Sequence, residues 1–138
     1  MIKDLFADSS TKSSLGFKFR EKRLLFFKDK INRLNKPLKI LEVGGTLSFW
    51  ADRGYENHPE IHITVLNFDK KESPYKNIIS IEGDATNLSN IKDNQFDVCF
   101  SNSVIEHLFT RDNHIKMTMR FKGLVLFTLF KPLTDIFL

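Results

Sequence analysis

The sequence predicts an α/β fold with a doubly wound parallel sheet, and three observations support this prediction. Short β-branched apolar runs alternate with segments of helical periodicity along the 138 residues. The first apolar run ends in Gly44-Gly45, as a buried strand that turns tightly into a helix requires. Polar or small residues follow each later run. Such alternation favours right-handed crossovers onto a parallel sheet.

The pattern of apolar residues in the N-terminal part of the chain predicts one long helix. Residues 1–16 are polar and rich in Ser and Thr, and we expect them to be loose. From 17 to 35 the apolar side chains recur at helical spacing, and Pro37 closes that helix. The positions that carry this periodicity are Leu24, Leu25, Phe27, Ile31 and Leu34.

Four apolar runs bounded by turn residues predict strands. They cover Leu38–Val43, Ile61–Phe68, Ile78–Glu82 and Phe96–Ser101. Between the first two, we expect a short helix that Ser48 begins and that ends near Gly54. These elements together favour a Rossmann-like domain.

The chain after the fourth strand is less regular. Val104–Phe109 and Asp112–Arg120 have helical patterns, with Asp112 as the expected N-cap. Gly123–Phe130 is the candidate fifth strand, although little chain is left for a crossover helix. We therefore expect a sheet that is incomplete on its C-terminal side. The codons of Phe127–Asp135, read one frame over, permit Tyr-Phe-Ile-Gln-Thr-Pro-Asn, which raises the hypothesis that residues 117–138 are a frameshift product of a once longer gene.

Composition excludes several classes of protein. A hydrophobic content of 41% with 14 Phe supports a packed core and not a disordered chain. The single cysteine, Cys99, cannot form an internal disulfide, and its apolar surroundings predict a buried, inert thiol. No signal peptide and no apolar run of the roughly 20 residues that a membrane span needs is present. We therefore expect a cytoplasmic protein, and the histidines have no spacing that suggests a metal site.

Positive charge is concentrated near the N-terminus. Nine of the 21 Lys and Arg residues lie between residues 18 and 39, against only Glu21 and Asp29. Weak contact with an anionic surface is one interpretation of this segment. A solvated helix face, whose long basic side chains cover apolar neighbours, is the other.

Polar and small residues stand at the carboxyl end of every predicted strand. In an open parallel sheet these ends share one edge, and ligands bind beyond it. The four segments are 42–45 (Glu-Val-Gly-Gly), 67–69 (Asn-Phe-Asp), 83–85 (Gly-Asp-Ala) and 101–103 (Ser-Asn-Ser). Their coincidence predicts a lined binding site at that edge.

On these motifs the chain resembles the class I S-adenosylmethionine-dependent methyltransferases, in particular the bacterial small-molecule group. Lys39–Gly45 is similar to the family's first motif, and Phe96–Leu108 to its fourth-strand motif, which is the most specific match. The resemblance covers about residues 37–109, roughly half of a full-length fold. It implies one domain over 17–138, with a cofactor-binding half at 37–109 and an atypical tail at 117–138.

The resemblance also implies S-adenosylmethionine as cofactor, a small-molecule methyl acceptor and a set of roles. Backbone amides of the glycine turn, which an acid precedes, would receive the methionine carboxylate. Side chains after the second strand would bind the ribose. Side chains after the third strand would bind the adenine. The implied cofactor-binding residues are Glu42, Gly44, Gly45, Thr46, Asn67, Asp69, Asp84, Ala85 and Asn102. The residues implied to face the methyl group or the acceptor are Asn102, Glu106 and His107.

Structural alternatives remain open at several of these positions. Glu42 could bond the amides of the turn, and Asp84 could form a turn. Asn102 could cap a helix, and Glu106 with His107 could be an exposed pair. The glycine turn does not alternate as is usual in the family, and Asn67 stands where an acid is common.

Two other functions also remain open. One is a truncated, inactive remnant that binds an adenosyl ligand. The other is a nicotinamide-dinucleotide binder, which the absence of Gly-x-Gly-x-x-Gly disfavours. No nucleic-acid partner is expected, and the oligomeric state is open.

Overall fold

The computed structural model describes residues 15–101, 110–113, 115–117 and 125–129. The chain divides into two compact units, Met1–Leu34 and Asn35–Leu138. The domain boundaries expected from the sequence, at residues 17, 37, 109 and 117, stay predictions.

The first unit contains helix α2 (Leu15–Asn32). The helix begins two residues before the predicted start and ends at Asn32, where the amides of Arg33 and Leu34 bond back three residues to Lys30 and Ile31. Such bonds tighten a last turn and satisfy its carbonyls. Leu24, Phe27 and Ile31 are buried, as their spacing predicts. Leu25, predicted as part of the same apolar stripe, is instead 64% exposed because it lies on the opposite side of the helix.

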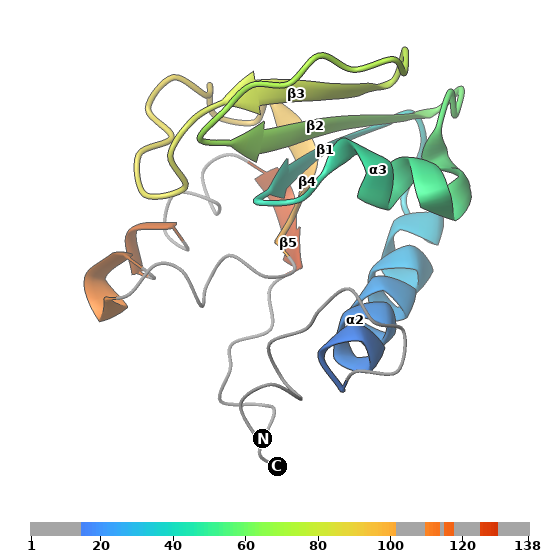
Figure 1. The fold of residues 1–138 in the computed structure, drawn as a ribbon, viewed down its shortest axis with the longest axis horizontal. Helices are drawn as coiled ribbons and strands as arrows, with labels where there is room; N and C mark the ends of the chain where they lie inside the picture. The colour runs from blue at the N-terminus through green and yellow to red at the C-terminus, as the bar shows by residue number, and fades with distance from the viewer. Residues whose placement is uncertain (1–14, 102–109, 114, 118–124, 130–138) are drawn as a thin grey trace. The chain divides into compact units, whose positions relative to one another are not determined.

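The second unit is built on a five-stranded sheet in the order β3-β2-β1-β4-β5, in which every neighbouring pair is parallel (Figure 1). The strands are β1 (Leu38–Val43), β2 (Ile61–Asn67), β3 (Ile78–Glu82), β4 (Phe96–Phe100) and β5 (Val125–Leu129). The predicted parallel α/β fold is thus confirmed. The bounds of β1 and β3 match the prediction, and β2 and β4 each end one residue earlier.

Strand β5 occupies the segment predicted as a fifth strand, and pairs with β4. The C-terminal side of the sheet therefore carries a strand that continues the parallel order. Most of residues 117–138 lie outside the described part of the chain, and their origin in a frameshift stays a hypothesis.

The crossovers differ in what they contain. After β1 comes helix α3 (Leu47–Trp50), which runs into one π-helical turn, η1 (Ala51–Tyr55). Gly54 within that turn has a φ of 81°, a conformation that glycine adopts without strain. The connections over residues 68–77 and 83–95 contain no helix. Near the C-terminal end, Thr110 and not the predicted Asp112 acts as a cap, since its Oγ1 accepts the amide of Asn113 at 3.2 Å.

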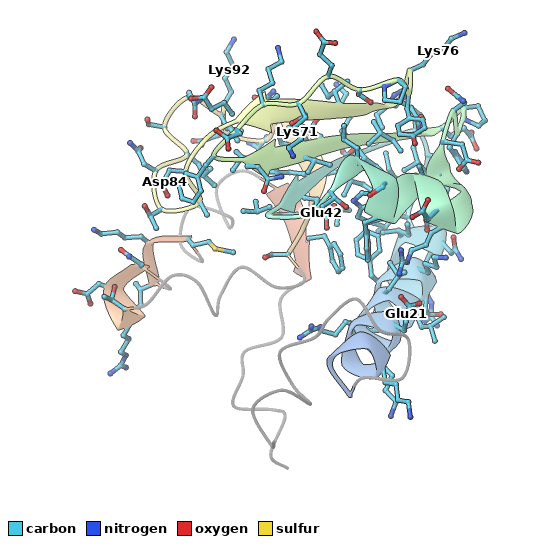
Figure 2. All side chains as sticks on the ribbon, in the orientation of Figure 1. Glu21, Glu42, Lys71, Lys76, Asp84 and Lys92 are labelled. Carbon is cyan, nitrogen blue, oxygen red and sulfur yellow. The ribbon has the colours of Figure 1, made fainter. Side chains whose placement is uncertain are left out.

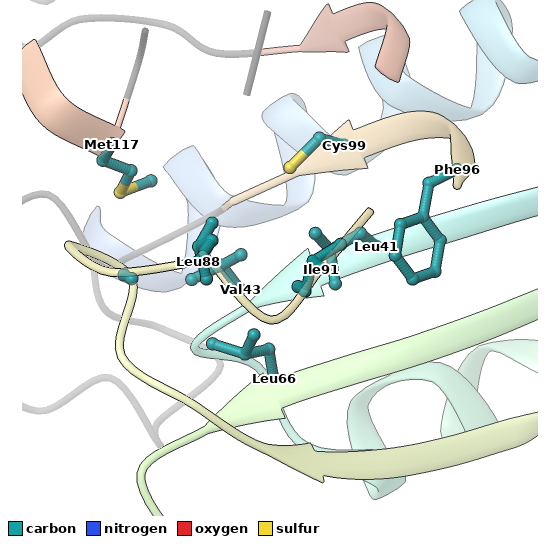
Figure 3. Packing of buried hydrophobic residues seen from close by; sticks show 9 residues of the cluster. Leu41, Val43, Leu66, Leu88, Ile91, Phe96, Cys99 and Met117 are labelled. Carbon is teal, nitrogen blue, oxygen red and sulfur yellow. The ribbon is translucent and has the colours of Figure 1, made fainter. Parts of the chain in front are cut away.

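Alternate residues of β1 point to opposite faces of the sheet, and the two faces pack differently. One face carries an apolar cluster that the 83–95 connection helps to cover (Figure 3). Its members are Leu41, Val43, Leu66, Ala85, Leu88, Ile91, Phe96, Cys99 and Met117. Burial there raises the pKa of the Cys99 thiol, as expected for an inert side chain.

The opposite face packs against α3 and η1. Trp50 lies at its centre, edge-on to Tyr55 at 5.3 Å and to Phe100 at 5.7 Å between ring centroids. Glu42 is on this face as well, because it pairs with Phe100 across β1 and β4. Across the described residues, no helix combines the length and apolar character needed to cross a membrane.

Candidate functional site at the carboxyl ends of the strands

Hydrogen bonds join the ends of the first three strands. The amide of Gly44 donates to the Leu66 carbonyl at 2.9 Å, and the Asn67 side-chain amide donates to the Gly45 carbonyl at 2.7 Å. The amide of Gly83 donates to the Asn67 carbonyl at 2.8 Å. The turn after β1 is thereby fixed to β2, and β2 to the loop after β3.

The end of β4 joins the same edge. The Ser101 hydroxyl donates to the Val43 carbonyl at 3.3 Å. All four strand ends singled out from the sequence are thus connected through their own residues. Of the segment 101–103, Ser101 alone belongs to the described part of the chain.

The two glycines after β1 are needed for different reasons. Gly44 has a φ of 79°, in the left-handed region where a side chain is strained. At Gly45 a Cβ would stand 2.1 Å from the Glu42 side-chain Cδ. The first glycine therefore permits the turn, and the second makes room for a carboxyl group beneath it.

Glu42 is a buried acid, 2% exposed, at the end of a strand. Its Oε2 accepts a hydrogen bond from the Trp50 indole N–H. Burial raises the pKa of Glu42 well above its usual value, and the nearby Arg53 charge offsets this in part. The carboxyl group thus lies between the glycine turn and the tryptophan, and supports the turn from inside the protein.

Trp50 is a site residue that the sequence analysis missed. It is fully buried, and its N–H reaches back eight residues to Glu42. Its position in the sequence could have indicated this role. Trp50 is the only tryptophan in the sequence, and it lies one helical turn after Thr46, the N-cap of α3. A buried indole N–H needs an acceptor, which here is the acid at the end of β1.

Thr46 is the N-cap of α3, and the prediction that Ser48 begins this helix is wrong. Thr46 has extended backbone angles, and its Oγ1 accepts the amide of Phe49 at 3.1 Å. Ser48 lies inside α3, with its hydroxyl 3.2 Å from that of Thr46. The helix has only four residues, so the backbone amides of the turn offer more to an anion than any helix dipole.

The two predicted ribose-binding residues lie at and after the end of β2. Asn67 is half-buried, and its amide group holds the Gly45 carbonyl. Asp69 is exposed, two residues beyond the strand. Asn67 therefore has a visible structural role, and ribose binding by either side chain stays a prediction.

Asp84 and Ala85 follow β3. Figure 2 shows Asp84 on the side of the sheet toward which the arrows of β2 and β3 point. Oδ1 of Asp84 accepts both the amide and the hydroxyl of Thr86, each at 2.8 Å, so the turn-forming alternative is present in the structure. Ala85 is 6% exposed and belongs to the apolar cluster. Adenine binding by these two residues stays a prediction.

The residues expected to face the methyl group or the acceptor, Asn102, Glu106 and His107, lie outside the described residues. Among those that the structure does describe, no three His, Cys, Asp or Glu side chains gather as metal ligands would. The described residues of this edge thus account for the position of the glycine turn.

Three comparisons with known proteins complete this description. The family model described as "Methyltransferase domain" matches residues 41–121, which include every candidate residue named above. No curated protein matches this chain. A solved structure described as a ribosomal RNA methyltransferase from Plasmodium falciparum is similar, at 15% identity over 83% of this chain and 72% of that one, with a TM-score of 0.49. A likeness of that size carries no information about substrates.

Proposed function

This chain belongs to the methyltransferase domain family, and on that premise we propose that it binds S-adenosylmethionine and transfers the methyl group to a small-molecule acceptor. The observation that carries the proposal is the hydrogen-bonded edge. The Asn67 amide fixes Gly45, and the Gly83 amide bonds to Asn67, so three of the proposed binding segments are held together before any ligand arrives.

The residues at this edge fit the parts of the cofactor. Thr46 is exposed and Gly45 is half-buried, and their backbone amides can receive a carboxylate, whereas the Gly44 amide is bonded to the Leu66 carbonyl and shapes the turn. Asn67 and Asp69 offer oxygen acceptors for a ribose diol. Asp84 offers a carboxylate to the adenine amine, with the Ala85 amide as a donor to a ring nitrogen. Asp84 remains suited to this role because both Thr86 bonds fall on one of its two oxygens.

In this proposal the protein acts mainly by holding donor and acceptor in line. When bound, S-adenosylmethionine supplies a methyl group already activated by a sulfonium. Positioning of two reactants can lower a barrier by roughly 7–11 kcal/mol. Glu42 and Trp50 contribute by keeping the glycine turn in place. Asn102, Glu106 and His107 are the proposed groups on the acceptor side, where a base is useful for a hydroxyl or a protonated amine.

The acceptor is proposed as a small molecule because of the segment from Phe96 to Leu108, which resembles the fourth-strand motif of the small-molecule enzymes.

Calorimetric titration with S-adenosylmethionine and S-adenosylhomocysteine tests the cofactor assignment, with three variants. Asp84→Ala removes the adenine acceptor and the turn. Asp84→Asn retains an oxygen for Thr86 and loses the negative charge, and Thr86→Val removes one turn bond and leaves the acid. We expect both Asp84 variants to weaken both ligands by about tenfold, as the loss of a charged hydrogen bond does, and Thr86→Val to have little effect.

Each other outcome is informative. If Thr86→Val weakens binding as much as Asp84→Ala, then Asp84 acts through its turn and the adenine assignment is wrong. Binding of both ligands with no turnover of any tested acceptor would favour the inactive remnant. Binding of a nicotinamide dinucleotide in preference to both would overturn the proposal.

A further inference from the structure

One side of helix α2 is exposed and combines basic with apolar side chains. Leu25 and Phe26 are 64% and 56% exposed. They are opposite the stripe of Leu24, Phe27 and Ile31, which is buried. We call the exposed side the outward face, and it comprises Lys18, Lys22, Leu25, Phe26, Asp29 and Arg33, with Lys30 at its margin.

The members of the outward face are three or four positions apart, so they stand side by side on the helix. Two interactions organise it. The Arg33 guanidinium bonds the Asp29 carboxylate at 2.9 Å, and the Lys30 ammonium lies 5.1 Å from the centre of the Phe26 ring. Lys18 and Lys22 are exposed, and Glu21, which is partly buried, is the acidic residue at the margin of this face nearest to them. The face therefore has a net positive charge around two hydrocarbon side chains.

We propose that the outward face of α2 docks on an anionic lipid membrane, with Leu25 and Phe26 entering the headgroup boundary and Lys18 and Lys22 beside the lipid phosphates. Charge complementarity selects the partner, because lysine near an anionic bilayer is attracted by its surface potential. The bilayer boundary also accepts both aliphatic and aromatic side chains. This proposal goes beyond methyl transfer and does not depend on it.

The same side chains fit other partners less well. RNA is commonly bound by arginine guanidinium groups and by aromatic rings on which bases stack. Here the Arg33 guanidinium is bonded to Asp29, and the Lys30 ammonium lies over the Phe26 ring. Leu25 has no ring on which a base could stack. A second copy of the helix would bring Lys18 and Lys22 against like charges. RNA binding and self-association are therefore outcomes that the experiment must separate from lipid binding.

Co-sedimentation of the full chain with vesicles tests the proposal. We expect binding to vesicles that contain phosphatidylglycerol and not to pure phosphatidylcholine. The double substitution Leu25→Ser with Phe26→Ser should reduce binding by about tenfold or more, since it removes most of the buried hydrocarbon. Lys22→Gln should reduce it by about fivefold. Raising the salt until the Debye length falls from about 8 Å to about 3 Å should release the protein.

A matched control distinguishes this face from exposed apolar side chains in general. Ile79 in β3 is 49% exposed and lies on another element, so Ile79→Ser should leave vesicle binding unchanged. Circular dichroism checks that each variant is folded.

Four results would overturn the proposal: equal binding to both kinds of vesicle, no vesicle binding, loss of binding in Ile79→Ser, or unchanged binding in the folded Leu25/Phe26 variant. Capture of a homopolymeric RNA by the outward face in the absence of vesicle binding would assign it to nucleic acid. A concentration-dependent dimer abolished by the double substitution, again without vesicle binding, would assign it to a second copy.

Discussion

The two faces of the sheet in the second unit are formed by the same strands but differ in the side chains that they bury. Leu41 and Val43 of β1 point into the apolar cluster, where every member is hydrophobic. Ile40 and Glu42, the residues between and beside them, point to the face that α3 and η1 cover. One face is an ordinary hydrophobic core, and the other places a buried acid directly beneath the glycine turn.

This difference separates stability from positioning. The apolar cluster gains from burial alone, which is not directional. The face with Glu42 contains a directional hydrogen bond from Trp50 to a buried carboxyl group, which has a raised pKa and lies against the backbone of Gly45. We therefore expect changes in the cluster to alter unfolding, and changes near Glu42 to alter ligand binding as well.

The largest expected effect is on the apolar face. Leu88 is 2% exposed in the connection that covers the cluster, and Leu88→Ala should lower the free energy of unfolding by about 3 kcal/mol. Urea denaturation followed by circular dichroism measures this. Ser89→Ala, an exposed neighbour, should stay within about 0.5 kcal/mol of wild type. If folded Leu88→Ala binds S-adenosylmethionine much more weakly, the two faces are not separable.

Gly45→Ala tests the other face next. Its Cβ would overlap the Glu42 carboxyl group, which Trp50 holds in place, so we expect a loss of about 2 kcal/mol and a clear loss of ligand affinity. Gly54→Ala is the matched control. Gly54 also has a positive φ, of 81°, but a Cβ at this position would have no neighbouring atom within 4 Å. The substitution should lower the free energy of unfolding by about 1 kcal/mol without changing ligand affinity.

The double variant with Glu42→Ala should recover part of the stability that Gly45→Ala loses, because the overlapping group is gone. Losses that simply add would mean that the carboxyl group is not what excludes a side chain at position 45.

Trp50→Phe removes the indole donor and retains a ring. The Glu42 oxygen then loses its partner, and we expect a loss of about 1.5 kcal/mol in thermal or urea unfolding. A double-mutant cycle with Glu42→Leu isolates the hydrogen bond, since the tryptophan substitution should cost less when no acceptor is present. An unchanged cost in that background would show that packing with Tyr55 and Phe100, and not the bond, explains the loss.

The pH dependence of stability tests the same carboxyl group. The folded pKa of Glu42 is raised, so above the unfolded value of about 4.3 the native chain holds a proton that the unfolded chain has lost. The free energy of unfolding should therefore fall as the pH rises through this window, and level off above the folded pKa.

Glu42→Gln cannot titrate but still accepts the Trp50 N–H. It should abolish this fall and be more stable than wild type at neutral pH, while ligand affinity is retained. Unfolding curves of both proteins over a pH series measure this. A variant that loses stability with pH as wild type does would assign the dependence to another group.

Most of the fold could be predicted because its signals are local. The apolar run of β1 lies between Pro37 and Gly44, and that of β3 lies between Asn77 and Gly83. The ends of both strands can therefore be predicted from adjacent residues. The parallel order follows from the chain connections. The edge of the sheet as the site follows from the same topology.

What could not be predicted depends on contacts between distant residues. By residue type, Ser48 is a better N-cap than Thr46. In the structure the cap is Thr46, whose Oγ1 accepts the amide of Phe49. The hydrogen bond from Trp50 to Glu42 joins a helix to the end of a strand, and no local sequence pattern predicts it. Leu25 and Leu24 are identical in type and adjacent, and only the packed structure distinguishes the buried one.

The place of Trp50 has a practical consequence. A lone indole in an apolar, water-free setting emits at short wavelength, and a carboxyl group on its N–H is a nearby quencher whose strength changes with protonation and distance. Since that carboxyl group lies under the glycine turn, the intrinsic fluorescence of the unlabelled protein should respond to a ligand that binds at the turn. The chain thus contains its own optical reporter, with which cofactors and acceptors can be screened without modification.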